Sequence, residues 1–323
     1  DIYYPILEII RNHSDGLLRY IKNGAIKIVD GNRGETILTV PVNEFTENTK
    51  ILFNKIRDGE GAFAIPDIEE FMGKVNLTAL KASSADKTDI TLVVHDLKTG
   101  FKPTLGFSIK SRLGNPSTLL NPSRATNFIY KVENIDDNLF NQVNAINTRL
   151  KIRNRIEEIE SKGGQIKYHS IENEVFKLNL QVIDSNLPII LANIVLNYYK
   201  GLGSDLATLL ENLEQDNPCH YKMDYHHSFY SYKIKTFLTD IALGMTPTHV
   251  WSGKYDATGG YIIVKEDGEL LCYHIYNMNE FQDYLLKNTR LDTPSSSRYG
   301  FGKLYKENNE YFIKLNLQIR FKA

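Results

Sequence analysis

The segment TDITLVVHDLKTGFKPTLGFSIKSRLG, residues 88–114, has the pattern of two short strands around a turn. Residues of high strand propensity fill each half, and KTGFKP between them holds the glycine and proline that favour a turn. Asp89 opens the first strand and Lys110 closes the second. Pairing the strands brings the start of one beside the end of the other, so the segment predicts an acid and a lysine at one place on a sheet.

Successive side chains of a strand point to opposite faces, which decides what Asp89 and Lys110 can meet. Asp89 shares a face of the first strand with Thr91, and Ser108 shares a face of the second strand with Lys110. We therefore expect Asp89, Ser108 and Lys110 to lie together on the polar face. The other face of the second strand is expected to enter the core with Leu105, Phe107 and Ile109.

This combination of side chains suits phosphodiester hydrolysis. The carboxylate of Asp89 can hold Mg²⁺, which prefers oxygen ligands, and the main-chain carbonyl of Ile109 can be a further ligand. The metal lowers the pKa of a bound water and neutralises charge on the phosphate. Lys110 can orient that water or stabilise the anionic transition state. An acid at one strand end and a lysine at another are also common on solvated surfaces, so the spacing alone does not decide between these interpretations.

Polar residues that suit contact with DNA lie on either side of the hairpin and near the C-terminus. Arginine and asparagine read base edges, and lysine, serine and tyrosine bind phosphates. The segment 288–303 combines arginines and serines with little apolar content, and it is our candidate for sequence specificity, although a solvated loop has the same composition. The predicted DNA-binding residues are Lys87, Arg112, Asn115, Ser117, Asn121, Arg124, Asn127, Arg290, Arg298, Tyr299 and Lys303.

Composition bounds the class of protein. The chain has 323 residues, of which 42% are hydrophobic and 24% charged, as in an ordinary globular protein. The net charge of -1 gives no global basic excess, although a local surface can still be basic. The two cysteines form no CxxC pair, which fits a reducing, cytoplasmic setting. No signal peptide is expected, and the longest apolar runs are too short to span a bilayer.

The remaining pattern predicts an α/β (α+β) protein with a mixed central sheet flanked by helices. Helices are expected near the N-terminus over residues 2–13 and over residues 139–162, and residues 176–200 are expected to form a strand, a turn and a helix. Two C-terminal hairpins, at 259–277 and 302–322, predict a β-rich end. We expect a nuclease core over residues 1–200 and a β-rich DNA-recognition subdomain over 201–323, unless the two form one continuous unit.

Other motifs carry less information. The stretch CHYKMDYHHSFY, residues 219–230, gathers a cysteine, an aspartate and three histidines, but no second half with zinc-ligand spacing follows. A histidine-rich surface loop or a DNA-facing loop is the preferred interpretation. Neither GxGxxG nor GxxxxGK[ST] occurs, so nucleotide binding has no support.

The runs LKASSADKTDITLVVHD and GFSIKSRLGNPSTLLNPSRATNFIYKV, with DTPSSSRYGFGKLY near the C-terminus, resemble the HpaII family of type II restriction endonucleases. The resemblance implies a restriction-endonuclease-like PD-(D/E)xK core and cleavage of double-stranded DNA at CCGG with Mg²⁺. It places Asp89 at the motif aspartate, Ser108 at the (D/E) position and Lys110 at the lysine. Serine is a poor substitute for a carboxylate ligand, so a second acid is expected among Glu8, Glu69, Glu70 and Asp96, or on an acidic helix of the family ahead of residue 1, or one metal suffices.

Partners follow from the same resemblance. Enzymes that cut both strands of a palindrome are often homodimers, and a DNA methyltransferase that protects the host site is expected as a functional partner. Three alternatives remain open from the residues alone. The chain can bind DNA on a nuclease fold that has lost its chemistry, cut DNA by structure rather than sequence, or have no nucleic-acid role.

Overall fold

The computed structural model describes residues 6–11, 16–21, 24–59, 65–77, 88–95, 98–111, 113 and 116–322. The chain divides into two compact units. Unit 1 comprises Asp1–Pro116 and Tyr255–Tyr276, and unit 2 comprises Ser117–Lys254 and Asn277–Ala323. The boundary expected after residue 200 therefore falls within unit 2, because the segment from Tyr255 to Tyr276 returns to pair with the strands of unit 1.

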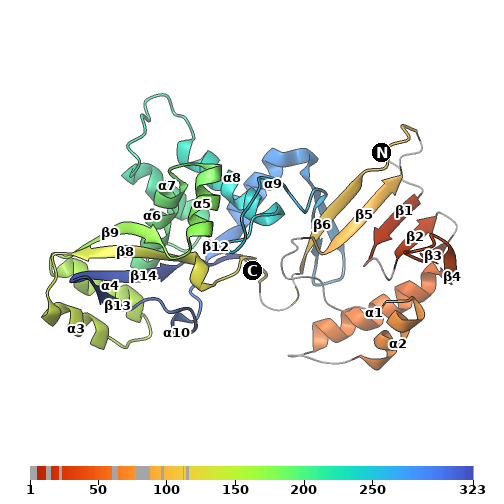
Figure 1. Cartoon of the computed structure of the whole chain (residues 1–323), viewed down its shortest axis with the longest axis horizontal. Helices are drawn as coiled ribbons and strands as arrows, with labels where there is room; N and C mark the ends of the chain where they lie inside the picture. Colours follow the sequence, from red (N-terminus) through yellow and green to blue (C-terminus); the bar gives the residue numbers. More distant parts are fainter. Residues whose placement is uncertain are drawn as a thin grey trace. The chain divides into compact units, whose positions relative to one another are not determined.

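Unit 1 is built on a sheet that has eight strands among the described residues (Figure 1). Their order across the sheet is β11-β10-β6-β5-β1-β2-β3-β4. Every neighbouring pair is antiparallel except β10 and β6, which run parallel, so the sheet is mixed as expected. The strands are β1 (Ile6–Ile10), β2 (Leu17–Ile21), β3 (Ala25–Val29), β4 (Thr36–Pro41), β5 (Ile90–His95), β6 (Thr104–Ser111), β10 (Gly260–Val264) and β11 (Leu270–His274).

The helices α1 (Val42–Asp58) and α2 (Pro66–Lys74) cover one face of this sheet (Figure 1). The core between them contains Ile28, Val40 and Val75, with Phe45 and Phe71 packed against it. The rings of Phe45 and Phe71 meet edge to face at 5.0 Å. Pro66 begins α2 and Gly59 follows the last residue of α1, where proline and glycine are favoured.

The helix predicted near the N-terminus is wrong for its described part. Residues Ile6–Ile10 form β1, which is hydrogen-bonded to β5 on one side and to β2 on the other. Apolar residues fill both faces of this short segment, so helical and strand spacing are equally satisfied. Hydrogen bonding to a neighbouring strand on each side, with β-branched residues among the neighbours, stabilises the segment as a strand. Local propensity does not contain this information.

Unit 2 combines two small sheets with a cluster of helices (Figure 1). Among its described residues the strand orders are β12-β15-β7 and β13-β14-β8-β9, all antiparallel. The strands are β7 (Thr118–Leu120), β8 (Asn127–Glu133), β9 (Gln165–Ile171), β12 (Thr289–Leu291), β13 (Leu304–Glu307), β14 (Glu310–Asn316) and β15 (Ile319–Phe321). The helices are α3 (Asp137–Ala145), α4 (Lys151–Ser161), α5 (Glu174–Ile183), α6 (Leu187–Lys200), α7 (Leu206–Asp216), α8 (Phe229–Leu243), α9 (Met278–Asn288) and α10 (Ser296–Tyr299).

The helix α6 is the centre of unit 2. It packs against α4, α5, α7 and α8 and against strands β9 and β14, so it is apolar nearly all round. The buried phenol of Tyr130 on β8 donates a hydrogen bond to the carbonyl of Ala192 and ties the sheet to this helix. No single helix in the described part of the chain is long and apolar enough to cross a membrane; α5 and α6 reach that length only together, with a bend of 111° between them.

The strand predicted after residue 176 is wrong, because the segment forms α5. Phe176, Asn179 and Leu180 are buried at helical spacing, whereas Leu178 and Val182 are exposed on the other side. Asn173 caps the helix by accepting a hydrogen bond from the backbone N–H of Phe176. The alternating apolar residues of this segment resemble a strand, but the cap and the burial pattern are those of a helix.

The long helix predicted over 139–162 is divided into α3 and α4. The break covers residues 146–150, where Ile, Asn and Thr are weak helix formers. The guanidinium of Arg155 on α4 donates hydrogen bonds to the carbonyls of Val143 and Ile146 at the end of α3. A single buried side chain therefore adds hydrogen bonds at the end of α3, where the break leaves carbonyls short of helical partners.

Candidate active site

The predicted hairpin is β5 paired with β6, and Asp89 is the residue that directly precedes β5. The backbone N–H of Asp89 donates to the carbonyl of Phe107 at 2.9 Å, the last rung between the two strands. Beyond that hydrogen bond, the side chain of Asp89, and not the backbone of its strand, is the partner of β6. Its Oδ2 accepts hydrogen bonds from the N–H of Ile109 at 2.6 Å and from the hydroxyl of Ser108 at 3.1 Å.

The backbone of Ile109 therefore faces the carboxylate of Asp89. The N–H and C=O groups of one strand residue point to the same side of the strand, so the carbonyl of Ile109 also points toward the side of Asp89. Within the described part of the chain, Oδ1 of Asp89 forms no hydrogen bond or ion pair. One carboxylate oxygen and one main-chain carbonyl are thus presented together, which are the hard oxygen donors that Mg²⁺ takes alongside water.

Lys110 lies on the face of β6 that carries Ser108 and Gly106, with its ammonium 5.4 Å from the ring centroid of Tyr261 on β10. Tyr261 is 1% exposed, and it lies opposite Ser108 in the parallel register between β10 and β6. Burial lowers the pKa of Lys110 below its ordinary value, and the carboxylate of Asp89 opposes part of that shift. Such a lysine gives up a proton more easily than an exposed one.

Two details of the hairpin differ from the sequence prediction. Ile109, expected in the core, is 39% exposed, whereas Ser108 on the polar face is only 3% exposed. The hairpin β10–β11 explains the burial of Ser108, because β10 pairs with the free edge of β6 and brings Tyr261 alongside. Sequence reasoning missed Tyr261 because nothing local indicates that a strand about 150 residues later joins β6 in parallel.

The predicted second acid is not found among the described candidates. Glu8 on β1 lies opposite Val93, so it is about 13 Å along the strand from Asp89 at a rise of 3.3 Å per residue. Its carboxylate contacts Arg19 at 2.5 Å and His95 at 3.1 Å. Burial raises the pKa of Glu8, but the bonds from Arg19 and His95 outweigh it and hold the pKa below its ordinary value.

The other described acid candidates lie on the other face of the sheet. Glu69 and Glu70 are exposed on α2, which packs on the face of the sheet opposite to Ser108 and Lys110. Asp96 lies outside the described residues. Across the described ranges, including the stretch from Cys219 to His227, no group of three or more His, Cys, Asp or Glu side chains could hold a metal ion. Within the described ranges, the carboxylate of Asp89 and the main-chain carbonyl of Ile109 are the oxygen donors that the hairpin brings together.

The predicted DNA-binding residues divide into three groups. Lys87, Arg112 and Asn115 lie outside the described residues. Asn121, Arg124, Arg298 and Lys303 are exposed, and the guanidinium of Arg298 lies 5.4 Å from the ring centroid of Tyr299. Ser117, Arg290 and Tyr299 are partly buried. The Ser117 carbonyl accepts the N–H of Phe321, and Arg290 on β12 lies opposite Arg320.

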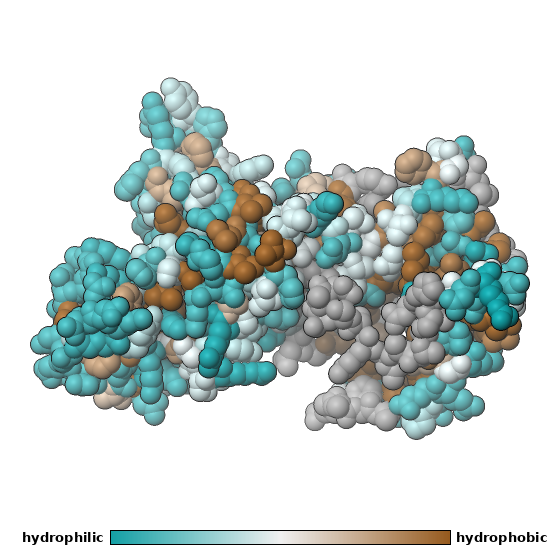
Figure 2. All heavy atoms as spheres, in the orientation of Figure 1, coloured by the Kyte–Doolittle hydropathy of each residue, from teal (hydrophilic) through white to brown (hydrophobic). Residues whose placement is uncertain are grey.

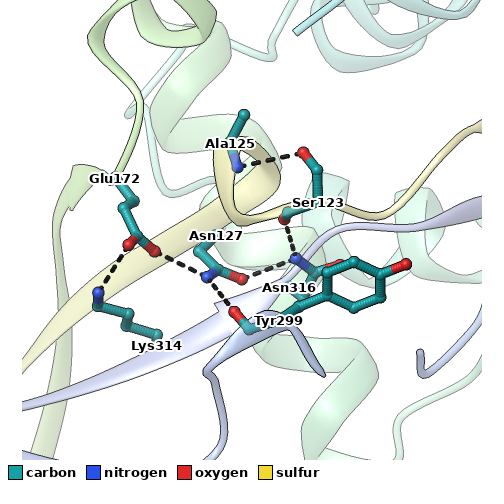
Figure 3. A network of polar contacts seen from close by, with 7 residues as sticks. All are labelled: Ser123, Ala125, Asn127, Glu172, Tyr299, Lys314 and Asn316. Atoms are coloured by element: carbon teal, nitrogen blue, oxygen red, sulfur yellow. Dashed lines mark hydrogen bonds and ion pairs between the residues drawn. The ribbon is translucent and has the colours of Figure 1, made fainter. Parts of the chain in front are cut away.

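Asn127 must be corrected, because its side chain is completely buried and does not reach a surface. Its amide donates to Glu172 at 2.7 Å and to the carbonyl of Tyr299 at 2.9 Å, and its oxygen accepts from Asn316 at 2.7 Å (Figure 3). Asn316 also donates to the carbonyl of Ser123 at 2.7 Å. Asn127 therefore fastens the predicted specificity loop to the sheet instead of contacting DNA itself.

Comparison with known proteins agrees with this arrangement. The family model described as HpaII restriction endonuclease matches residues 1–321. The type II restriction enzyme HpaII of Haemophilus parainfluenzae is 47% identical over 322 residues, which cover 99% of this chain and 89% of that enzyme. No solved structure matches the chain. The match extends over both units and includes the strands that carry Asp89, Ser108 and Lys110, so the chain belongs to the HpaII restriction endonuclease family and is a sequence-specific type II restriction enzyme.

Proposed function

We propose that this enzyme cuts double-stranded DNA at CCGG with Mg²⁺ as cofactor, and that Asp89, Ile109 and Lys110 form the cleavage site. The observation that carries the proposal is the carboxylate of Asp89, held by the N–H of Ile109 at 2.6 Å on the same sheet face as the partly buried Lys110. A carboxylate, a main-chain carbonyl and a lysine at one strand end are the groups that metal-assisted phosphodiester hydrolysis needs.

The residues of the chain divide the work as follows. Ser108 and the N–H of Ile109 fix Oδ2 of Asp89, so Oδ1 and the Ile109 carbonyl would be the oxygens that hold Mg²⁺. Bound Mg²⁺ supplies a water of lowered pKa and neutralises charge on the phosphate. Lys110, whose pKa is lowered by burial, orients the attacking water and stabilises the negative charge that grows on the phosphate oxygens. Ser108 positions Asp89 and is not itself a strong ligand.

Specificity is proposed to come from the segment 288–303, which contains β12 and α10. Arg298 is exposed there, and Lys303 lines a neighbouring cavity of about 740 Å³. Arginine pairing with O6 and N7 of guanine is the commonest specific base contact, which suits a site made only of G·C pairs. We also propose that two copies act on the palindrome as a homodimer, in the cytoplasm, with a methyltransferase protecting the same sequence.

The test is cleavage of a plasmid that contains several CCGG sites, followed by sequencing of the fragment ends. Discrete fragments that all end within CCGG, formed with Mg²⁺ and absent with a chelator, are the expected result. The same plasmid with every CCGG replaced should stay intact. Fragments that share a different sequence would overturn CCGG, and cutting in the presence of the chelator would overturn the metal assignment.

A further inference from the structure

Two cavities in the described part of unit 2 lie on either side of the turn at Ser296 and Ser297, with volumes of about 740 Å³ and 560 Å³. Both are lined by Ser296, Ser297 and Lys151. Lys151 begins α4, so the turn and the start of this helix form a continuous hollowed surface. In Figure 2 the part of unit 2 that carries α3, α4 and α10 is largely hydrophilic.

The charges around the cavities are of one sign. No Asp or Glu lines either cavity in the part of the chain that the structure describes. The whole chain has 38 basic and 39 acidic residues, so its composition would place both signs around a cavity. Six basic residues without an acid therefore show that positive charge is concentrated here. The six are Arg149, Lys151, Arg153, Arg155, Lys303 and Lys314.

Several of these charges have no internal counter-charge. Arg149, Lys151 and Lys303 form no ion pair or side-chain hydrogen bond with the described residues, whereas Arg153 pairs with Glu157 and Lys314 with Glu172. Arg155 is 2% exposed, and among the described residues its guanidinium bonds only to the carbonyls of Val143, Ile146 and Gly302. A buried guanidinium held by neutral groups keeps its positive charge, which adds to the potential of the cavity.

The surface is also rigidly built. Gly302 has a φ of +84° and lies so close to α4 that a Cβ would be 2.7 Å from Ile152. Arg155 holds the backbone of the same segment at Gly302. Asn127 holds it at Tyr299 (Figure 3). The loop therefore meets a ligand in a fixed conformation, so little ordering entropy opposes binding.

We infer that Arg149, Lys151 and Lys303, around the buried Arg155, form a basic wall that binds the phosphates of the DNA backbone. Cations distributed over two adjacent cavities, with serine hydroxyls between them, suit a row of phosphates better than a single small anion. The inference rests on the action of this family on DNA. It depends neither on CCGG nor on the chemistry of the hairpin, because backbone contacts set affinity and register but carry no sequence information.

The test is the salt dependence of DNA binding by the full chain. A fluorescent duplex containing CCGG and one without it are titrated in metal-free buffer with chelator, by anisotropy, over a range of KCl concentrations. The variants are Arg149→Gln, Lys151→Gln and the pair together. Lys162→Gln is the matched control, since Lys162 is exposed at the other end of α4, about 16 Å away at 1.5 Å per residue.

Each lost phosphate contact should reduce the slope of log K against log salt by about 0.9, so the double variant loses about 1.8, equally on both duplexes. Lys162→Gln should keep the slope of the unaltered chain, and thermal unfolding should show that all variants fold. Variants that bind with the unaltered slope would overturn the inference alone. Failure of the unaltered chain to bind either duplex at low salt would overturn both the basic wall and the proposed cleavage of DNA.

Discussion

At the scale of the residue, Lys110 combines a cost in stability with its proposed role in cleavage. The side chain is partly buried beside Tyr261, where protonation is opposed by burial and only partly supported by Asp89. A folded-state pKa below that of the unfolded chain means that the protonated lysine opposes folding. Enzymes keep such groups where the chemistry needs them.

We expect Lys110→Met to abolish cleavage, by about 10²–10³-fold or more, while the melting temperature at neutral pH stays equal or rises. Methionine keeps the apolar stem and removes the buried charge. The stability gain should shrink as the pH rises from the lowered folded-state pKa toward 10.5, since in that window the native lysine is already neutral when folded. Melting curves across pH check this; a gain that grows with pH would contradict the buried-cation account.

Residue-scale prediction succeeded where it depended on neighbours in sequence. Strand alternation and one turn were enough to predict that Asp89 meets Ser108, which the hydrogen bond at 3.1 Å confirms. It failed for Asn127, whose role is set by Glu172, Tyr299 and Asn316, up to 189 residues away. An asparagine in a polar stretch looks like a surface contact until those distant partners are known.

At the scale of the element, the site depends on how β10 reaches β6. The loop before β10 crosses Gly106, where the N–H of Gly259 donates to the Gly106 carbonyl at 2.6 Å and Thr258 accepts from the Gly106 N–H at 3.2 Å. A Cβ on Gly106 would lie 2.4 Å from the carbonyl oxygen of Asp256 and 2.9 Å from Oγ1 of Thr88. Thr88 precedes Asp89, so this glycine supports the position of Asp89.

Gly106→Ala is therefore expected to destabilise unit 1 by about 1–3 kcal/mol through overpacking and to slow cleavage by displacing Asp89. Gly73→Ala is the control, because Gly73 lies in α2 with open space around its Cα, and alanine there should stabilise the helix by about 0.8–1 kcal/mol. Denaturant unfolding and initial cleavage rates measure both effects. Equal stability and activity of the two variants would contradict the role of Gly106.

The elements that the sequence predicts correctly are those bounded by residues that favour turns. The hairpins expected at 259–277 and 302–322 are present as β10 paired with β11 and β13 paired with β14. The wrong predictions concern β1 and α5, where the apolar residues fit both helical and strand spacing. In both cases the deciding contacts come from other elements, which a single sequence does not display.

At the scale of the whole molecule, the boundaries of the two units do not coincide with a change in composition. The hairpin β10–β11 belongs to the sheet of unit 1 although the segments before and after it belong to unit 2. A net charge of -1 likewise conceals the basic wall beside α10. Fold class and the pair Asp89 and Lys110 were within reach of the sequence, whereas unit boundaries and charge segregation require the packed chain.

The central claim is that Asp89 beside β6 carries the cleavage chemistry, and the most direct test is Asp89→Asn assayed for cleavage and for binding on one CCGG duplex. Asparagine keeps the shape and can still accept the Ile109 N–H, but it removes the charge that holds a cation. Asp58→Asn, at the exposed end of α1, is the control. We predict that Asp89→Asn loses cleavage by at least about 10²–10³-fold with Mg²⁺ and binds the duplex in chelator as the unaltered chain does. Cleavage by Asp89→Asn at the unaltered rate would show that the chemistry lies elsewhere.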